Sequence, residues 1–223
     1  MPTQTFANLP AAKRDALLTL ALEEFAAHPY QQASLSQIVE RAGIAKGSIY
    51  QYFANKQDLY LFLIEHAAQS QLDLLSGLEP PDLALDLFAL LRWQMRASLQ
   101  VGLATPLQTQ LLYRAHNDPL PFRDEVTHRL QQAGGGHLHT LLAQAQARGE
   151  LAPDLDLDVA AFVVGRVLGD LRELLLQRLG VSLDEAAGDL RLLESPVAEA
   201  LYDQVLRILQ CGLAARPVVD QSG

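Results

Sequence analysis

The sequence has very little of what marks a disulfide-bonded domain, a thiolate metal site or a membrane protein. Cys211 is the single cysteine among 223 residues, so no intramolecular disulfide is possible, and we expect this thiol to pack within the last helix. The most apolar stretch, VAAFVVGRVLG, is broken by Arg166 and is too short to cross a bilayer. Because the first residues hold no basic segment followed by an apolar run, the sequence predicts a cytoplasmic protein without a membrane segment.

Strand patterns and catalytic motifs are also missing. There is no long alternation of Val, Ile, Thr and aromatic residues, whereas Leu, Ala, Gln, Arg and Glu dominate, which favours an all-α protein. No G-x-S-x-G or Walker pattern occurs. His137 and His139 would point about 200° apart around a helix, which is a poor geometry for sharing a metal ion. The sequence therefore predicts neither an enzyme nor a bound metal or cofactor.

Lysine is scarce, and its distribution divides the chain. All lysines (Lys13, Lys46 and Lys56) precede Tyr60, and acids balance bases up to that residue. The formal net charge of −9 therefore arises entirely beyond it. We expect two regions under different demands, one neutral and one acidic.

Proline and glycine indicate where the helices end. A short polar arm ends at Pro10, and an apolar stripe predicts a helix over residues 11–27 that Pro29 terminates. The segment GLEPPD is the clearest break in the first half of the chain. Further helices are expected at residues 82–100, 106–116, 122–148, 157–179 and 195–213, the third of these interrupted by the glycines at 134–136.

Two short helices joined by a tight turn follow the first helix. Ser34 begins an S-x-x-Q capping-box pattern with Gln37, and Gly43 is placed to end that helix in a left-handed conformation. Only Ile44 and Ala45 intervene before the next helical pattern, and Asn55 caps the helix after it. This spacing predicts a helix-turn-helix.

The second of these helices, in AKGSIYQYFANK, carries an unusual polar face. If Ile49 and Phe53 point inward, Gly47 and Gln51 lie nearly opposite the core. Glutamine can read a base edge with two hydrogen bonds, and glycine allows the backbone to approach a groove wall. Hydroxyl groups from Ser48 and Tyr50, and ammonium groups from Lys46 and Lys56, suit phosphates. The face therefore fits the major groove of DNA.

These residues carry a family resemblance. The apolar helix ending near Phe25, followed by SLSQIVERAGIAKGSIYQYFANKQDLY, resembles the DNA-binding domain of the TetR family of bacterial transcriptional regulators. The resemblance implies operator contacts from Lys46, Gly47, Ser48, Tyr50, Gln51, Tyr52 and Lys56, with Ser34 and Ser36 near phosphates. Two positions depart from the family pattern. Pro29 stands where glycine is usual, and Ala45 replaces a frequent side-chain cap, at a cost of about 1 kcal/mol.

The resemblance also implies a domain organisation. We expect an arm and a three-helix DNA-binding domain over residues 1–55, a helical effector-binding and dimerisation domain over residues 56–214, and a loose tail over residues 215–223. A homodimer would present two recognition helices to one operator. The candidate dimer surface comprises Val163, Val167, Leu171 and Leu174 with Leu201, Val205 and Ile208, unless these stripes face the chain's own core.

A small-molecule effector of unknown identity is the remaining expected partner. Candidate pocket residues are Trp93, Arg96, Tyr113, His116, Phe122, His137, Phe162 and Arg166, which combine aromatic surface with polar groups. The glycine triplet would be a hinge, a ligand contact or a plain helix break. We therefore predict a repressor that binds a palindromic operator as a dimer and is released by its effector. A DNA-bound structural or division-control protein, or an activator, are the alternatives.

Overall fold

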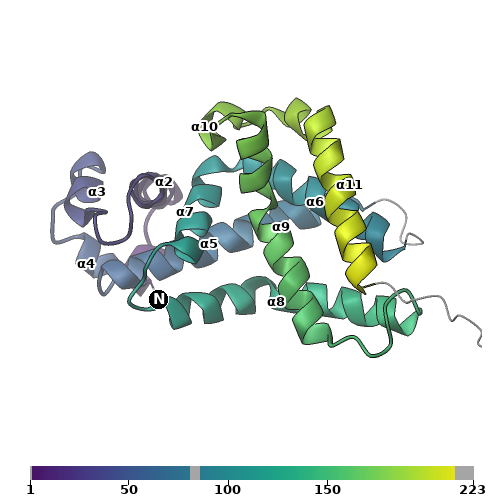
Figure 1. Cartoon of the computed structure of the whole chain (residues 1–223). Helices are drawn as coiled ribbons and strands as arrows, with labels where there is room; N and C mark the ends of the chain where they lie inside the picture. The colour runs from purple at the N-terminus through teal and green to yellow at the C-terminus, as the bar shows by residue number, and fades with distance from the viewer. Residues whose placement is uncertain (1, 81–85, 214–223) are drawn as a thin grey trace, which may run out of the picture. The chain divides into compact units, whose positions relative to one another are not determined.

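The computed structural model describes residues 2–80 and 86–213, and these residues form helices without a β-strand (Figure 1). The predicted all-α class is confirmed. The chain divides into two compact units: unit 1 comprises Met1–Asp73 and Thr105–Gly134, and unit 2 comprises Leu74–Ala104 and Gly135–Gly223. No helix within the described ranges has an apolar stretch long enough to cross a membrane.

Unit 1 contains the helices of the N-terminal segment, up to Asp73, and those of a second segment, from Thr105 to Gly134. They are α1 (Gln4–Ala7), α2 (Ala11–Ala27), α3 (Leu35–Arg41), α4 (Ile49–Tyr52), most of α5 (Lys56–Ser76), α7 (Pro106–Asn117) and the first half of α8 (Arg123–Ala147). Helix α2 packs against both α3 and α7. Its last carbonyl groups, at Ala26 and Ala27, accept hydrogen bonds from the Arg114 guanidinium at 2.7 and 3.1 Å. The sequence predicted the end of α2 from Pro29 alone, but Arg114 on α7 also caps it.

Unit 2 contains α6 (Leu87–Ala104), the second half of α8, α9 (Leu157–Leu179), α10 (Leu183–Ala186), the 3₁₀-helix η1 (Leu190–Glu194) and α11 (Pro196–Leu213). Helix α11 packs against α6, α9 and η1. The bounds of α2 and α9 match the predicted ones, whereas α10 and η1 were not predicted. The first residues of the helix expected at 82–100 lie outside the described residues.

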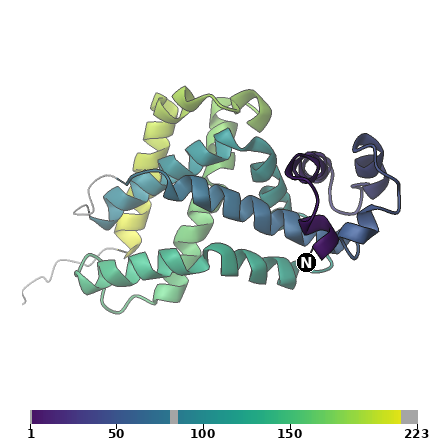
Figure 2. The same cartoon turned by 180° about the vertical axis from the view of Figure 1, so that it is seen from behind.

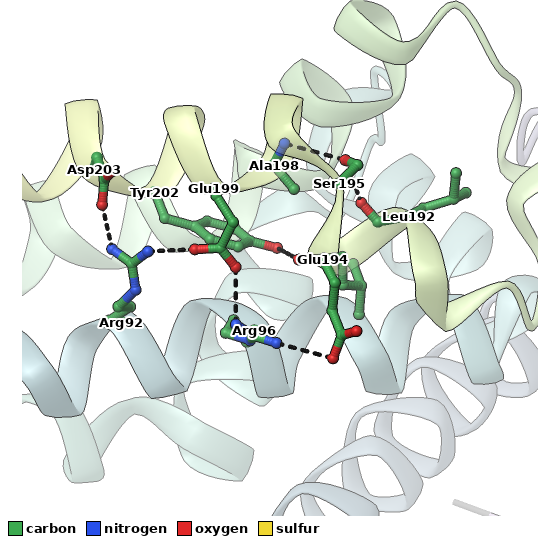
Figure 3. A network of polar contacts seen from close by, with 10 residues as sticks. Arg92, Arg96, Leu192, Glu194, Ser195, Ala198, Glu199, Tyr202 and Asp203 are labelled. Carbon is green, nitrogen blue, oxygen red and sulfur yellow. Dashed lines mark hydrogen bonds and ion pairs between the residues drawn. The ribbon is translucent and has the colours of Figure 1, made fainter.

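A polar network joins α6 to α11 and η1 (Figure 3). Arg92 pairs with Glu199 and Asp203, while Arg96 pairs with Glu199 at 2.8 Å and with Glu194 at 3.3 Å. Glu199 therefore accepts from both guanidinium groups. Beneath them, the buried Tyr202 hydroxyl donates to the Leu193 carbonyl at 3.3 Å, and burial raises the pKa of Tyr202 to about 12. The network ties the last helix to the core of unit 2.

The predicted interruption of α8 at residues 134–136 is wrong, because the helix is continuous from Arg123 to Ala147. Three glycines cost about 3 kcal/mol of helix propensity, but tertiary contacts hold the helix on both sides of them. Within unit 1, Arg129 on α8 pairs with Glu65 on α5 at 2.7 Å, and also with Glu125 one turn away on α8 itself at 2.7 Å. Within unit 2, Leu142 is fully buried in the core.

Two smaller expectations are also corrected. Cys211 is exposed and does not pack in the core, because the neighbouring α11 residues Leu209 and Leu213 occupy the buried face. The segment before Pro10 was expected to be a short polar arm, but its residues 4–7 form α1, and Phe6 in that helix is only 2% exposed. Both differences arise from contacts that a local sequence pattern does not contain.

Candidate nucleic-acid interface

The start of α3 is held by two different side chains. The Ser34 hydroxyl accepts from the Gln37 amide at 3.4 Å, as the capping pattern predicts. The Ser34 amide donates to Glu24 on α2 at 2.7 Å. Glu24 is only 4% exposed, so a buried carboxylate on α2 holds the start of α3. Glu24 was not among the predicted residues, although its sequence signal is an acidic residue within the apolar stripe of α2.

Replacing Glu24 by alanine is expected to lower the free energy of unfolding by about 1–3 kcal/mol, because the partly buried Ser34 amide loses its acceptor. Urea unfolding of the full chain measures this change. The matched control is Glu23→Ala, which removes a solvent-exposed ion pair with Arg41 and should cost less than about 1 kcal/mol. Equal losses in the two variants would contradict the role given to Glu24.

The turn between the helices follows the predicted geometry. Gly43 has a φ of 64°, in the left-handed region that favours glycine. Its amide donates to the Glu40 carbonyl at 3.1 Å, and the Ile44 amide donates to the Val39 carbonyl at 3.1 Å. These bonds close the last turn of α3 and direct the chain into the next helix.

The recognition segment, residues 45–53, is less regular than the predicted helix. Its first bonds run from the Ser48 amide to the Ala45 carbonyl at 2.8 Å and from Tyr50 to Gly47 at 3.2 Å. Both span three residues, and α4 itself covers only Ile49–Tyr52 without a side-chain cap. The tight start agrees with the absence of a capping side chain at Ala45.

The recognition segment has the polar outer face that the sequence predicts. Ile49 and Phe53 are 2% and 1% exposed, while Lys46, Tyr50 and Gln51 are exposed. A Cβ added to Gly47 would meet no atom within 4 Å, so the fold does not require glycine there. Among the other predicted contact residues, the side chains of Ser34, Ser48 and Tyr52 are half-buried, and that of Ser36 is exposed. Figure 1 shows α3 and α4 as consecutive short helices.

Lys56 differs from Lys46 because its ammonium group already has partners. Its Nζ donates to the Gln31 carbonyl at 3.3 Å and lies 4.8 Å from the centre of the Tyr30 ring. Desolvation by burial lowers the pKa of Lys56, and the charge of Glu24 opposes this shift. Lys46 has an exposed side chain, which makes it the cleaner probe of phosphate contacts.

The predicted effector residues are divided between the two units. Tyr113, His116 and Phe122 belong to unit 1, and Phe122 stacks edge-on against Tyr30 there. Trp93, Arg96, His137, Phe162 and Arg166 belong to unit 2. In that unit Arg166 pairs with Asp170 at 2.9 Å, Phe162 is 70% exposed and Trp93 is half-buried, while the side chain of His137 is outside the described part.

A hollow of about 170 Å³ occurs within unit 1, and none of the predicted effector residues lines it. Its apolar lining includes Leu18, Leu63 and Ala67, and its polar lining includes Asp15, His66 and Gln108. These residues belong to α2, α5 and α7.

The predicted dimer stripe separates into buried and exposed residues. Leu171 and Leu201 pack in the core of unit 2 and so are not available to a partner. Val167 and Val205 are half-buried. The exposed apolar residues on α9 and α11 are Val159, Phe162, Val163, Leu174, Val197 and Ile208.

A helix-turn-helix with an exposed polar recognition segment defines a DNA-binding protein of the helical class. The sequence matches the bacterial regulatory proteins of the tetR family over residues 17–62 and the tetracyclin repressor-like C-terminal domain over residues 85–214. The chain therefore belongs to the TetR family, and it is a DNA-binding transcriptional regulator.

Similar proteins agree with this assignment. The crystal structure of a TetR family transcriptional regulator from Chloroflexus aurantiacus is 38% identical, with 97% of this chain and 100% of that chain covered and a TM-score of 0.78. The probable acrEF/envCD operon repressor of Escherichia coli K12 is 29% identical over 205 residues, which cover 87% of this chain and 86% of that protein. Bacillus subtilis FadR, solved in complex with stearoyl-CoA, shares the fold at 19% identity, with 89% and 98% covered and a TM-score of 0.66.

Proposed function

We propose that this regulator is a repressor that binds an inverted-repeat operator as a homodimer and releases it when a small molecule binds. The observation that carries the proposal is the recognition segment. Its apolar residues Ile49 and Phe53 are buried, and its polar residues Lys46, Tyr50 and Gln51 are exposed. Repression is supported by the E. coli relative, which is named as an operon repressor.

Dimerisation is supported by the exposed apolar residues of α9 and α11. Phe162 and Ile208 are 70% and 69% exposed in the isolated chain. Contact of such large apolar side chains with water is unfavourable, and a partner that covers them would lower the free energy. A two-fold axis would pair this surface with its own copy and present two recognition helices at once. The half-buried Val167 and Val205 would border the contact.

Release by a small molecule requires two conformations with different DNA affinities. An effector that prefers the weakly binding conformation by several kcal/mol shifts the population away from DNA. B. subtilis FadR, with a similar fold, was crystallised with stearoyl-CoA. Acyl-CoA molecules are therefore the first effectors to test. The positions to probe are the candidate residues Trp93, Arg96, Tyr113, His116, Phe122, His137 and Arg166, whereas the exposed Phe162 is assigned to the dimer surface.

Selection of bound duplexes from a random-sequence pool tests the function. We expect an inverted repeat whose half-site centres are separated by about 34–36 Å, or a multiple of a helical turn. Adding effector candidates, beginning with stearoyl-CoA, to the complex with the selected duplex should then release the DNA. Binding to many unrelated sequences with no small-molecule response would instead support a DNA-bound structural or division-control protein.

A further inference from the structure

We propose that the N-terminal helix α1 is a positioning element for the recognition helix α4, and that Thr3 and Phe6 set the orientation in which Gln51 meets a base. In Figure 2 the short purple helix beside the N-terminus, α1, lies next to the blue segment that contains α4. Helices α1 and α4 are in contact. The inference rests on the DNA recognition assigned to α4 above.

Helix α4 needs external support because it is too short to be stable alone. It covers four residues, begins without a side-chain cap and is preceded by bonds that span only three residues. Isolated helices below about 12 residues are marginal in water. At the C-terminal end of α4, the amide of the next residue, Phe53, donates to the Ile49 carbonyl at 2.9 Å. The carbonyl groups of the following residues must find partners elsewhere.

Thr3 supplies those partners from the beginning of the chain. Its amide donates to the Tyr52 carbonyl at 2.9 Å, and its hydroxyl donates to the Gln51 carbonyl at 2.6 Å. The same hydroxyl accepts from the Phe6 amide at 3.4 Å and so caps α1. One side chain therefore joins the start of α1 to the end of α4, at the backbone of the residue proposed to read a base.

Phe6 anchors α1 so that Thr3 stays in place. Its ring is 2% exposed and lies 4.9 Å from the Phe53 ring, 5.7 Å from Phe62 and 6.1 Å from Tyr52, measured between ring centres. Aromatic pairs at these separations stabilise one another beyond the area that they bury. The family match begins at residue 17, within α2, so α1 lies outside the matched part of the chain.

Thr3→Val tests the inference, because it removes the hydroxyl while keeping the side-chain shape. In the full chain, the preference for the selected duplex over a random duplex should fall about five-fold per half-site, or about 25-fold for a dimer. The dependence of affinity on salt should stay unchanged, because no phosphate contact is removed. Hydrogen exchange at the Phe53 amide should become faster. Thr3→Ser, which keeps the hydroxyl, should restore both the preference and the slow exchange.

Thr19→Val is the matched control. Its hydroxyl also donates to a carbonyl, that of Asp15 at 2.9 Å, but within α2 itself, so this variant should bind like the original chain. The inference is overturned if Thr3→Val keeps its preference within about two-fold, if it weakens both duplexes equally, or if Thr3→Ser loses as much. Each of these results requires that the original chain selects a specific duplex. Failure to select one would count against the proposed repressor and not against the role of α1.

Discussion

Glutamate at Phe162 or Ile208 is expected to convert a dimer into a monomer and to lower operator affinity by about two to four orders of magnitude. The two side chains are among the most exposed apolar residues of the described chain, on α9 and α11 respectively. A buried charge without a partner strongly opposes association. The loss in DNA affinity follows because two linked recognition helices bind one operator far more tightly than either helix alone.

Light scattering of the full chain at micromolar concentration measures the change in mass, and titration with the selected duplex measures affinity. Leu190→Glu is the matched control, because Leu190 is an exposed apolar residue of unit 2 on η1, outside the proposed surface. It should leave both mass and affinity unaffected. A dimer that survives both Phe162→Glu and Ile208→Glu would exclude the surface on α9 and α11.

Alanine at Gln51 and alanine at Lys46 are expected to weaken DNA binding in different ways. Gln51→Ala should relax the preference at one base pair in each half-site, at a cost of about 1–3 kcal/mol per half-site, because an amide that pairs with a base edge is lost. Lys46→Ala should weaken all duplexes alike and reduce the salt slope by about 0.9 for each phosphate contact removed. Measuring selected and random duplexes over a range of salt separates the two effects.

Lys13→Ala is the control for the lysine change, because Lys13 is exposed on α2, outside the recognition segment. Lys56→Ala is a less direct probe, since its ammonium group contacts the Gln31 carbonyl and the Tyr30 ring and its removal should also destabilise unit 1. If Lys46→Ala leaves affinity and salt slope untouched at low salt, the assignment of that residue to a phosphate is wrong.

Local patterns were enough to predict much of the DNA-binding region. Ser34, Gly43 and Asn55 were predicted from bonds to residues three to five positions away, and the structure contains such a bond at each of them. At Ser34 only the hydroxyl half of the predicted capping box is present, because the Ser34 amide donates to Glu24 instead. The inward direction of Ile49 and Phe53 also follows from helix geometry alone. The DNA contacts of the outward residues stay predictions, because they depend on a partner that the chain does not contain.

Long-range contacts account for what the local patterns missed. Glu24 appeared as an acidic residue in an apolar stripe, and its acceptor role exists only because α2 brings it to Ser34. Phe6 appeared as a lone aromatic in a polar arm, and its partners Phe53 and Phe62 lie far along the chain. The stripe containing Leu171 and Leu201 showed that these faces are apolar, but periodicity does not tell whether the chain or a partner covers them.

The amino-acid order alone therefore specified the all-helical class, most helix ends and the inward and outward faces of the recognition segment, because these depend on rules acting over a few residues. Tertiary structure decided how α3 and α4 are held, which apolar residues stay exposed, and that α8 continues through its glycines. These outcomes depend on residues that lie far apart in sequence and meet only after the chain has folded. Thr3 illustrates the difference, since its bonds to the carbonyls of Gln51 and Tyr52 join positions nearly 50 residues apart.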